Sequence, residues 1–270
     1  MFTTNPYSFF TTEWNSLKLD ILDSSLLSAD SSWFFPNVIS SYNRLYFMLE
    51  GDAYLTNEQG RWPLRPGYMY LIPANSCYTY YCDSHIHKFY LHFNLELFPG
   101  TDLFSYFDTF HELPLSSELL HTILSEVEKD SFSGLFRLKS ILWDIIFRFY
   151  LQGTKGTDYI EHFEGYFRQK HVLNYLSEHL DANLLIPKIA EDLNIPVHSL
   201  SRTFRKDTGH SLKEYINKML YQKACNLLLH TDTPIYEIAE ALGFSDPYYF
   251  SRFFKNKSGI SPRSFRKYCC

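Results

Sequence analysis

Two runs of polar side chains in the last third of this 270-residue chain share one spacing. The first polar stripe is His198, Ser201, Arg202 and Arg205, and the second polar stripe is Tyr248, Ser251, Arg252 and Lys255. Positions i, i+3, i+4 and i+7 lie on one face of an α-helix. Arginine can form two hydrogen bonds to the major-groove edge of guanine, serine and histidine can reach bases or phosphates, and lysine neutralises phosphate. Each stripe therefore has the chemistry of a helix that contacts double-stranded DNA.

Apolar residues in the same segments predict which face of each helix is exposed. Leu200 and Phe204 lie four residues apart, as Phe250 and Phe254 do, so each pair forms an apolar ridge along its helix. Arg202 lies two positions from Leu200, about 200° around the helix, and must point away from that ridge. Taken singly, each polar residue is better explained as an ordinary solvated side chain. The same stripe repeated over the same ridge favours DNA contact.

The repetition extends to the segments before the stripes. Residues 189–191 return as residues 238–240 at an offset of 49, and Ser201, Arg202, Phe204 and Gly209 have counterparts at an offset of 50. The copies thus differ by one residue inserted in the turn between their halves. Each copy is predicted to be a helix, a short turn and a second helix, which is the layout of a helix-turn-helix unit.

The charges divide unequally along the chain. Residues 1–165 carry 10 Lys and Arg against 20 Asp and Glu, whereas residues 166–270 carry 15 against 10. Phosphate repels the first region and attracts the second, so nucleic-acid contact is expected only after residue 165. Five cysteines without a CxxC pair indicate reduced thiols. With no leader-like start and no apolar run of about 20 residues, the protein is expected in the cytoplasm and off the membrane.

The residues before the basic region predict a β domain followed by helices. Short aromatic or β-branched runs at 44–49, 52–56, 67–72, 78–81 and 87–93 predict strands of a barrel or sandwich. Residues 116–129 and 133–150 predict two amphipathic helices, which either pack on the barrel or form a homodimer face. The predicted divisions are a barrel with an N-terminal arm over 1–112, a helical dimerisation segment over 113–151, a linker over 152–165 and a DNA-binding domain over 166–270.

Residues 238–244, 246, 249–255, 259–262 and 265–266 together resemble the signature of the AraC/XylS family of bacterial transcription regulators. The resemblance implies a seven-helix domain whose long helix, here 211–229, holds two recognition helices in successive major grooves. Leu220 departs from the pattern, since many members have an arginine there. RNA polymerase is a further partner that such a regulator can contact. The candidate DNA-binding residues are His198, Ser199, Ser201, Arg202, Arg205, Tyr248, Tyr249, Ser251, Arg252 and Lys255, with Tyr248 and Tyr249 open to a packing role instead.

The strand region also resembles the cupin-like sensing domain that many family members carry. The shared stretches are 49–51, 64–67, 71–73 and 91–93. Aromatic side chains with a few polar groups suit a sugar ring or a similar small molecule, although a plain hydrophobic core has the same composition. The candidate effector-binding residues are Trp33, Arg44, Tyr46, Trp62 and His87.

Cupin barrels often hold metals, which makes a metalloenzyme the main rival for this domain. His85, His87 and His92 are the available histidines, but His92 has the opposite strand parity to the other two. No carboxylate completes a ligand set, so we expect no metal, no cofactor, no catalytic residue and no enzyme activity.

The predicted fold is thus a cupin-like β-barrel with a helical dimerisation segment and an all-α domain with two helix-turn-helix units. The predicted function is sequence-specific transcription regulation by a homodimer under small-molecule control, with a sugar as one candidate effector. The alternatives are a ligand-independent regulator that uses the barrel as an interaction platform, and a metalloenzyme fused to a DNA-binding domain.

Overall fold

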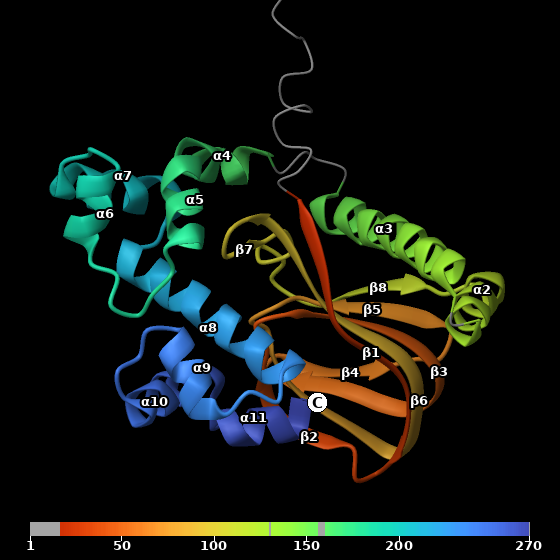
Figure 1. Ribbon diagram of the computed structural model, residues 1–270. Coiled ribbons are helices and arrows are strands. Elements are labelled where there is room, and N and C mark those ends of the chain that lie inside the picture. The colour runs from red at the N-terminus through yellow and green to blue at the C-terminus, as the bar shows by residue number, and fades with distance from the viewer. Residues whose placement is uncertain (1–16, 130, 156–159, 270) are drawn as a thin grey trace, which may run out of the picture. The chain divides into compact units, whose positions relative to one another are not determined.

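The computed structural model describes residues 17–129, 131–155 and 160–269 (Figure 1). The chain forms two compact units. The sheet unit contains Asp23–Phe93 and the described residues of Phe104–Asp158, and the helical unit contains Asn94–Leu103 with the described residues of Met1–Leu22 and Tyr159–Cys270. The predicted order of a β-rich domain followed by a helical domain is therefore confirmed.

The strands form one eight-stranded sheet in the order β1-β6-β3-β5-β8, with β2 and β7 paired to β6 and β4 paired to β3. Strand β3 pairs antiparallel with β4, β5 and β6. The strands are β1 (Lys18–Asp30), β2 (Phe34–Ile39), β3 (Asn43–Asn57), β4 (Gly60–Leu64), β5 (Tyr68–Ile72), β6 (Cys77–Phe98), β7 (Thr101–Asp102) and β8 (His111–Pro114).

Four of the predicted strands join into two long ones. Predicted strands 44–49 and 52–56 are both in β3, and 78–81 and 87–93 are both in β6. The register between β3 and β6 shifts on each side of Gly51, which has φ +107° and leaves no room for a side chain beside the His85 backbone. The Asp52 carboxylate accepts hydrogen bonds from Ser84 N (2.9 Å) and Ser84 Oγ (2.7 Å). A bulge rather than a chain reversal thus explains the polar residues at these points.

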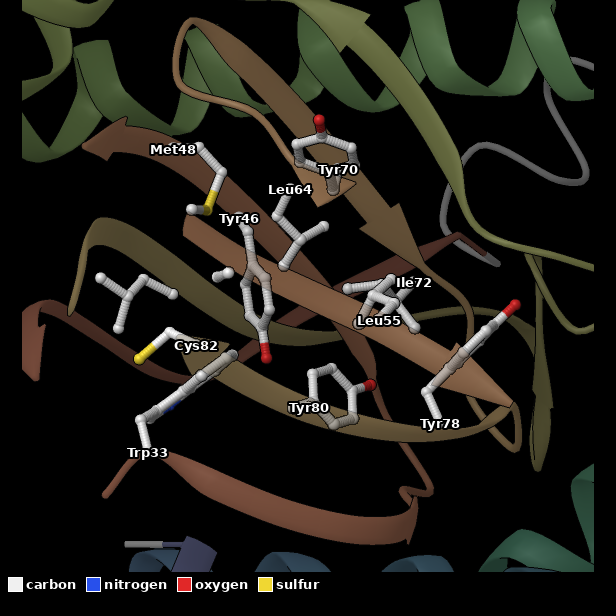
Figure 2. Close-up of a cluster of buried hydrophobic side chains, with 12 residues drawn as sticks. Trp33, Tyr46, Met48, Leu55, Leu64, Tyr70, Ile72, Tyr78, Tyr80 and Cys82 are labelled. Atoms are coloured by element: carbon white, nitrogen blue, oxygen red, sulfur yellow. The ribbon is translucent and has the colours of Figure 1, made fainter. Parts of the chain in front are cut away.

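Aromatic and aliphatic side chains fill the interior of the sheet unit (Figure 2). Two helices complete this unit, α2 (Ser117–Glu128) and α3 (Phe132–Thr154), as the helical periodicity predicted. Helix α3 buries the side chains of Leu142, Ile145, Ile146 and Phe149. In the described part of the chain, no helix combines the length and apolarity that crossing a bilayer requires.

The helical unit has eight helices in its described residues. They are α4 (Ile160–Arg168), α5 (Lys170–Glu178), α6 (Ile186–Asp192), α7 (Val197–Thr208), α8 (Leu212–His230), α9 (Ile235–Ala241), α10 (Pro247–Ser258) and α11 (Pro262–Cys269). Helix α4 begins inside the segment predicted as linker. Helix α8 starts with a capping box between Ser211 and Glu214 and packs against α7, α9, α10 and α11. This long helix therefore joins the two helix-turn-helix units, as the resemblance implied.

The end of β6 and strand β7 belong to the helical unit. The Phe98 ring stacks on Tyr166 of α4, with centroids 5.9 Å apart. The Tyr215 hydroxyl of α8 donates to the Pro99 carbonyl (2.6 Å) and lies 2.6 Å from Thr101 Oγ1. Buried rings and hydrogen bonds thus hold residues 94–103 on α4 and α8, although the sequence grouped them with the strands.

Candidate nucleic-acid interface

The first polar stripe lies on the exposed side of α7. Leu200 and Phe204 are 1% and 0% exposed. His198, Arg202 and Arg205 are exposed, while Ser199 and Ser201 are half-buried. The predicted faces of this helix are therefore confirmed, with the serines at the border between ridge and solvent.

The second polar stripe repeats this arrangement on α10. Phe250 and Phe254 are buried, Arg252 and Lys255 are exposed and Ser251 is half-buried. Tyr248 is 82% exposed, so its ring takes no part in the core. Tyr249 lies beside Phe244, with ring centroids 5.9 Å apart, and beside the Arg252 guanidinium, whose carbon is also 5.9 Å from the Tyr249 ring centre. Tyr249 thus both packs and borders the stripe.

The turn inside each helix-turn-helix unit has one backbone conformation. Asn194 has φ +53° and Gly243 has φ +81°, and both lie in the left-handed region. The next residue then donates to a helix carbonyl, from Ile195 N to Ala190 (2.8 Å) and from Phe244 N to Ala239 (2.9 Å). Asparagine tolerates this conformation best after glycine, which explains why it stands at position 194. The single inserted residue follows this point, before α10.

The two recognition helices also end alike. Gly209 and Gly259 have φ +75° and +79° and donate to the carbonyls of Arg205 (3.0 Å) and Lys255 (2.8 Å). The turns that end α7 and α10 therefore match, and the chain leaves both helices in the same way.

The basic side chains of both stripes have no acidic partner. Among the described residues, no ion pair involves Arg202, Arg205, Arg252 or Lys255. Asp192 of α6 is engaged elsewhere, since the Lys188 ammonium lies 2.7 Å from it. The stripes thus present basic groups that no ion pair among the described residues neutralises, which favours contact with phosphate.

Two side chains bind Asp207 near the end of α7: Arg168, the last residue of α4, and Gln169, which follows it. Arg168 lies 2.9 Å from its carboxylate and Gln169 donates to it at 2.6 Å. Burial raises the pKa of Asp207, but these hydrogen bonds together outweigh burial and leave its pKa below the usual value. Gly165 of α4 lies so close to the Asp207 backbone that any side chain would collide with it. These contacts fix the base of the first recognition helix.

Leu220 shows why α8 differs from the family pattern. The side chain is 1% exposed and lies on the buried side of α8. It cannot reach a phosphate, so the contact that an arginine would provide there is absent.

Comparison with known proteins assigns the helical unit. A helix-turn-helix domain family matches residues 189–268. The chain is 35% identical over 103 residues to the arabinose operon regulatory protein of Escherichia coli strain K12, which covers 38% of this chain and 35% of that relative. It is 27% identical to the Msm operon regulatory protein of Streptococcus mutans over 249 residues, 87% of each chain. The helical unit is therefore similar to the DNA-binding regions of AraC/XylS regulators.

Solved structures of ToxT align with nearly the whole chain. ToxT from Vibrio cholerae, with bound unsaturated fatty acid, aligns over 90% of this chain and 94% of its own with a TM-score of 0.55 at 15% identity. The sheet domain and the helical domain thus follow the architecture of ToxT. The chain is a DNA-binding transcription regulator.

The candidate effector-binding residues of this regulator do not all share one face. Trp33 and Tyr46 are in the buried cluster and Trp62 packs against it. The Arg44 guanidinium carbon lies 5.2 Å from the Tyr80 ring centre of the same cluster. His87 was wrongly grouped with them: it stands between Ile86 and Lys88, which point into the cluster, so it points to the other face.

Lys88 is the residue of this region that sequence reasoning missed. It pairs with Met48 across β3 and β6, and cross-strand partners project to the same face. The neighbouring histidines are dispersed. His85 is exposed and His92 Nδ1 lies 3.7 Å from Asp23, and no group of three potential metal ligands occurs among the described residues.

Proposed function

We propose that this regulator reads DNA bases with the two polar stripes, with Ser199 and Tyr249 at their borders. The observation that carries the proposal is that one pattern of exposed polar and buried apolar residues recurs on α7 and α10 at one register. Exposed arginines without acidic partners are available to bond guanine and phosphate. Two recognition helices attached to one long helix allow each chain to contact successive major grooves.

The two stripes are expected to read different sequences. Position 198 is histidine where position 248 is tyrosine, and position 205 is arginine where position 255 is lysine. Different donors and acceptors select different base edges. Each chain therefore recognises an asymmetric, directional site.

We further propose that a small molecule bound in the sheet domain controls DNA binding. Relatives carry names of sugar operons, such as arabinose and lactose, and ToxT binds an unsaturated fatty acid. Arg44, Tyr46, Trp33 and Trp62 supply the polar and aromatic groups that such a ligand needs. A coupling of about 1–3 kcal/mol between the two binding events is enough for a useful switch.

We propose that a second copy of the chain packs on α3. This helix has a second apolar face beside its buried one, and the residues of this outer face are 38–76% exposed. Helical spacing aligns Phe132, Phe136, Trp143 and Phe147 within about 60° of one another. Leu135 and Leu151 flank them. A symmetric dimer would cover this face and place two DNA-binding units on one operator.

Genome-wide mapping of the bound sites followed by footprinting tests the proposed function. We expect an asymmetric footprint for each chain and an affinity that falls steeply with salt, because phosphate contacts release counterions. Genes beside the sites would indicate the effector, and the position of each site relative to its promoter would indicate whether the regulator can contact RNA polymerase. Binding that does not depend on sequence or on salt would refute the proposal.

A further inference from the structure

Lys88 has its ammonium group inside the core of the sheet unit. The residue is 2% exposed. Its Nζ atom lies 3.2 Å from the centre of the Tyr46 ring, 4.6 Å from that of Trp33 and 5.5 Å from that of Tyr90. Ring faces attract a cation, but they do not supply the negative charge that a buried ammonium normally requires.

That negative charge is missing from the surroundings of Lys88. No residue in the part of the chain that the structure describes forms a hydrogen bond or an ion pair with its ammonium group. The Asp23 carboxylate contacts other groups, since it accepts a hydrogen bond from the Tyr90 hydroxyl (2.8 Å) and lies 3.7 Å from His92 Nδ1. Within the described residues, the buried ammonium of Lys88 thus has no counter-ion.

A second buried cation lies on the same face. Arg44 pairs with His92 across β3 and β6, as Met48 pairs with Lys88, so both basic side chains project into the same interior. Arg44 is 7% exposed. Burial, and then the positive charge of Arg44, hold the pKa of Lys88 well below its usual value. Two cations that disfavour each other occupy one buried region.

Aromatic rings border this region. The Trp33 and Tyr80 rings are 6.2 Å apart and the Tyr46 and Tyr80 rings 6.3 Å apart, all in edge-to-face geometry (Figure 2). Such rings provide apolar faces for the body of a ligand.

We propose that Lys88, with Arg44 beside it, binds the carboxylate or phosphate group of an anionic small-molecule effector, whose body packs on Trp33, Tyr46 and Tyr80. The proposal rests on the proposed effector function of the sheet domain and names the chemical class of the effector. A bound anion would offset the burial of the Lys88 ammonium.

The test compares matched neutral and anionic probes by calorimetry on the full chain. The probes are glucose and glucose 6-phosphate, galactose and galacturonate, and inorganic phosphate alone. We expect at least one anionic probe to bind at least about tenfold more tightly than its neutral partner. We expect Lys88→Met to abolish that preference, and Lys223→Met, which removes an exposed lysine from α8, to retain it.

The stability of the ligand-free variant provides a second readout. Methionine fills a similar volume without a charge, so Lys88→Met should unfold in urea at the same or a higher denaturant concentration than the wild type. A lysine that only supports the rings would give a less stable variant with unchanged probe binding. If Lys88→Met fails to fold, the wild type still tests the proposal through its preference for anionic over neutral probes.

Three results would overturn the inference. The first is equal binding of neutral and anionic partners, which would leave an effector site of neutral chemistry intact. The second is a preference for the anionic probe that survives Lys88→Met, and the third is no binding of any probe, inorganic phosphate included. DNA binding by the stripes does not depend on these probes, so the footprinting experiment judges the proposed function separately.

Discussion

Thr208 and Ser258 form the same hydrogen bonds in the two helix-turn-helix units. The Thr208 hydroxyl donates to the Phe204 carbonyl (2.8 Å) and accepts from His210 N (3.3 Å). The Ser258 hydroxyl can donate to the Ile260 carbonyl (2.7 Å) or the Phe254 carbonyl (3.0 Å), and it accepts from Ile260 N (3.3 Å). Both residues are buried where the recognition helix ends, so the duplication includes the polar groups that end the helices as well as those that face solvent.

Removing either hydroxyl should destabilise the helical unit to a similar extent. Thr208→Val and Ser258→Ala each leave a backbone N–H without its acceptor, and we expect a loss of about 1–2 kcal/mol in the free energy of unfolding. Urea denaturation followed by circular dichroism measures it. Thr122→Val is the control, because the Thr122 hydroxyl bonds a carbonyl on the exposed side of α2. A loss confined to one of the two variants would contradict the equivalence of the two ends.

Helical periodicity was sufficient to locate the polar stripes, because one helix contains both the ridge and the stripe. In α7, the positions of Leu200 and Phe204 fix the direction of Arg202 without reference to any other element. The expectation of buried ridges and exposed stripes therefore held for both helices. Contact with bases stays a prediction.

Strand faces could not be assigned in the same way. Alternation divides β6 into two faces but does not show which of them meets a given face of β3. His87 was grouped with Arg44 and Tyr46 as a candidate effector-binding residue, whereas the residue of β6 that pairs with Met48 is Lys88. The sheet is covered on both sides here, since Phe89 and Phe93 are buried as well. Hydrophobicity alone thus could not separate the two faces.

Alanine at either stripe arginine should weaken operator binding. We expect Arg202→Ala and Arg252→Ala each to cost on the order of 1–3 kcal/mol, concentrated at particular base positions of the site. Fluorescence anisotropy with a set of single-base operator variants measures both the loss and its position. Arg148→Ala removes the same charge from the exposed side of α3 and serves as the control. Unchanged binding in both stripe variants would refute the assignment of the stripes.

A charge on the outer face of α3 should disrupt the dimer. Phe136 is 64% exposed and lies on the outer face of α3, so Phe136→Glu would place a charge in the proposed dimer interface without affecting the core of the monomer. We expect a monomer in sedimentation equilibrium, together with weaker operator binding. Arg137→Glu adds an acid at the next position, which is exposed but outside the aromatic residues of this outer face, and this variant should stay dimeric. A wild-type chain that sediments as a monomer at micromolar concentration would exclude α3 as a stable dimer interface.

The stability of the helical unit should depend on pH through Asp207. Because the pKa of this carboxyl is lower in the folded state than its ordinary value of 3.8, the charged form favours folding. That contribution is complete above about pH 5 and is lost as the pH falls through the lowered pKa. Asp207→Asn removes the contribution, so the difference in unfolding free energy between wild type and variant should shrink as the pH drops below about 4.

Urea titrations at several pH values measure this difference, with Asp232→Asn as the control. Asp232 is exposed and forms no hydrogen bond or ion pair with the residues that the structure describes. Its replacement should leave the pH dependence unchanged. A difference between wild type and Asp207→Asn that stays constant from pH 7 to pH 3 would show that Arg168 and Gln169 do not favour the charged form of Asp207.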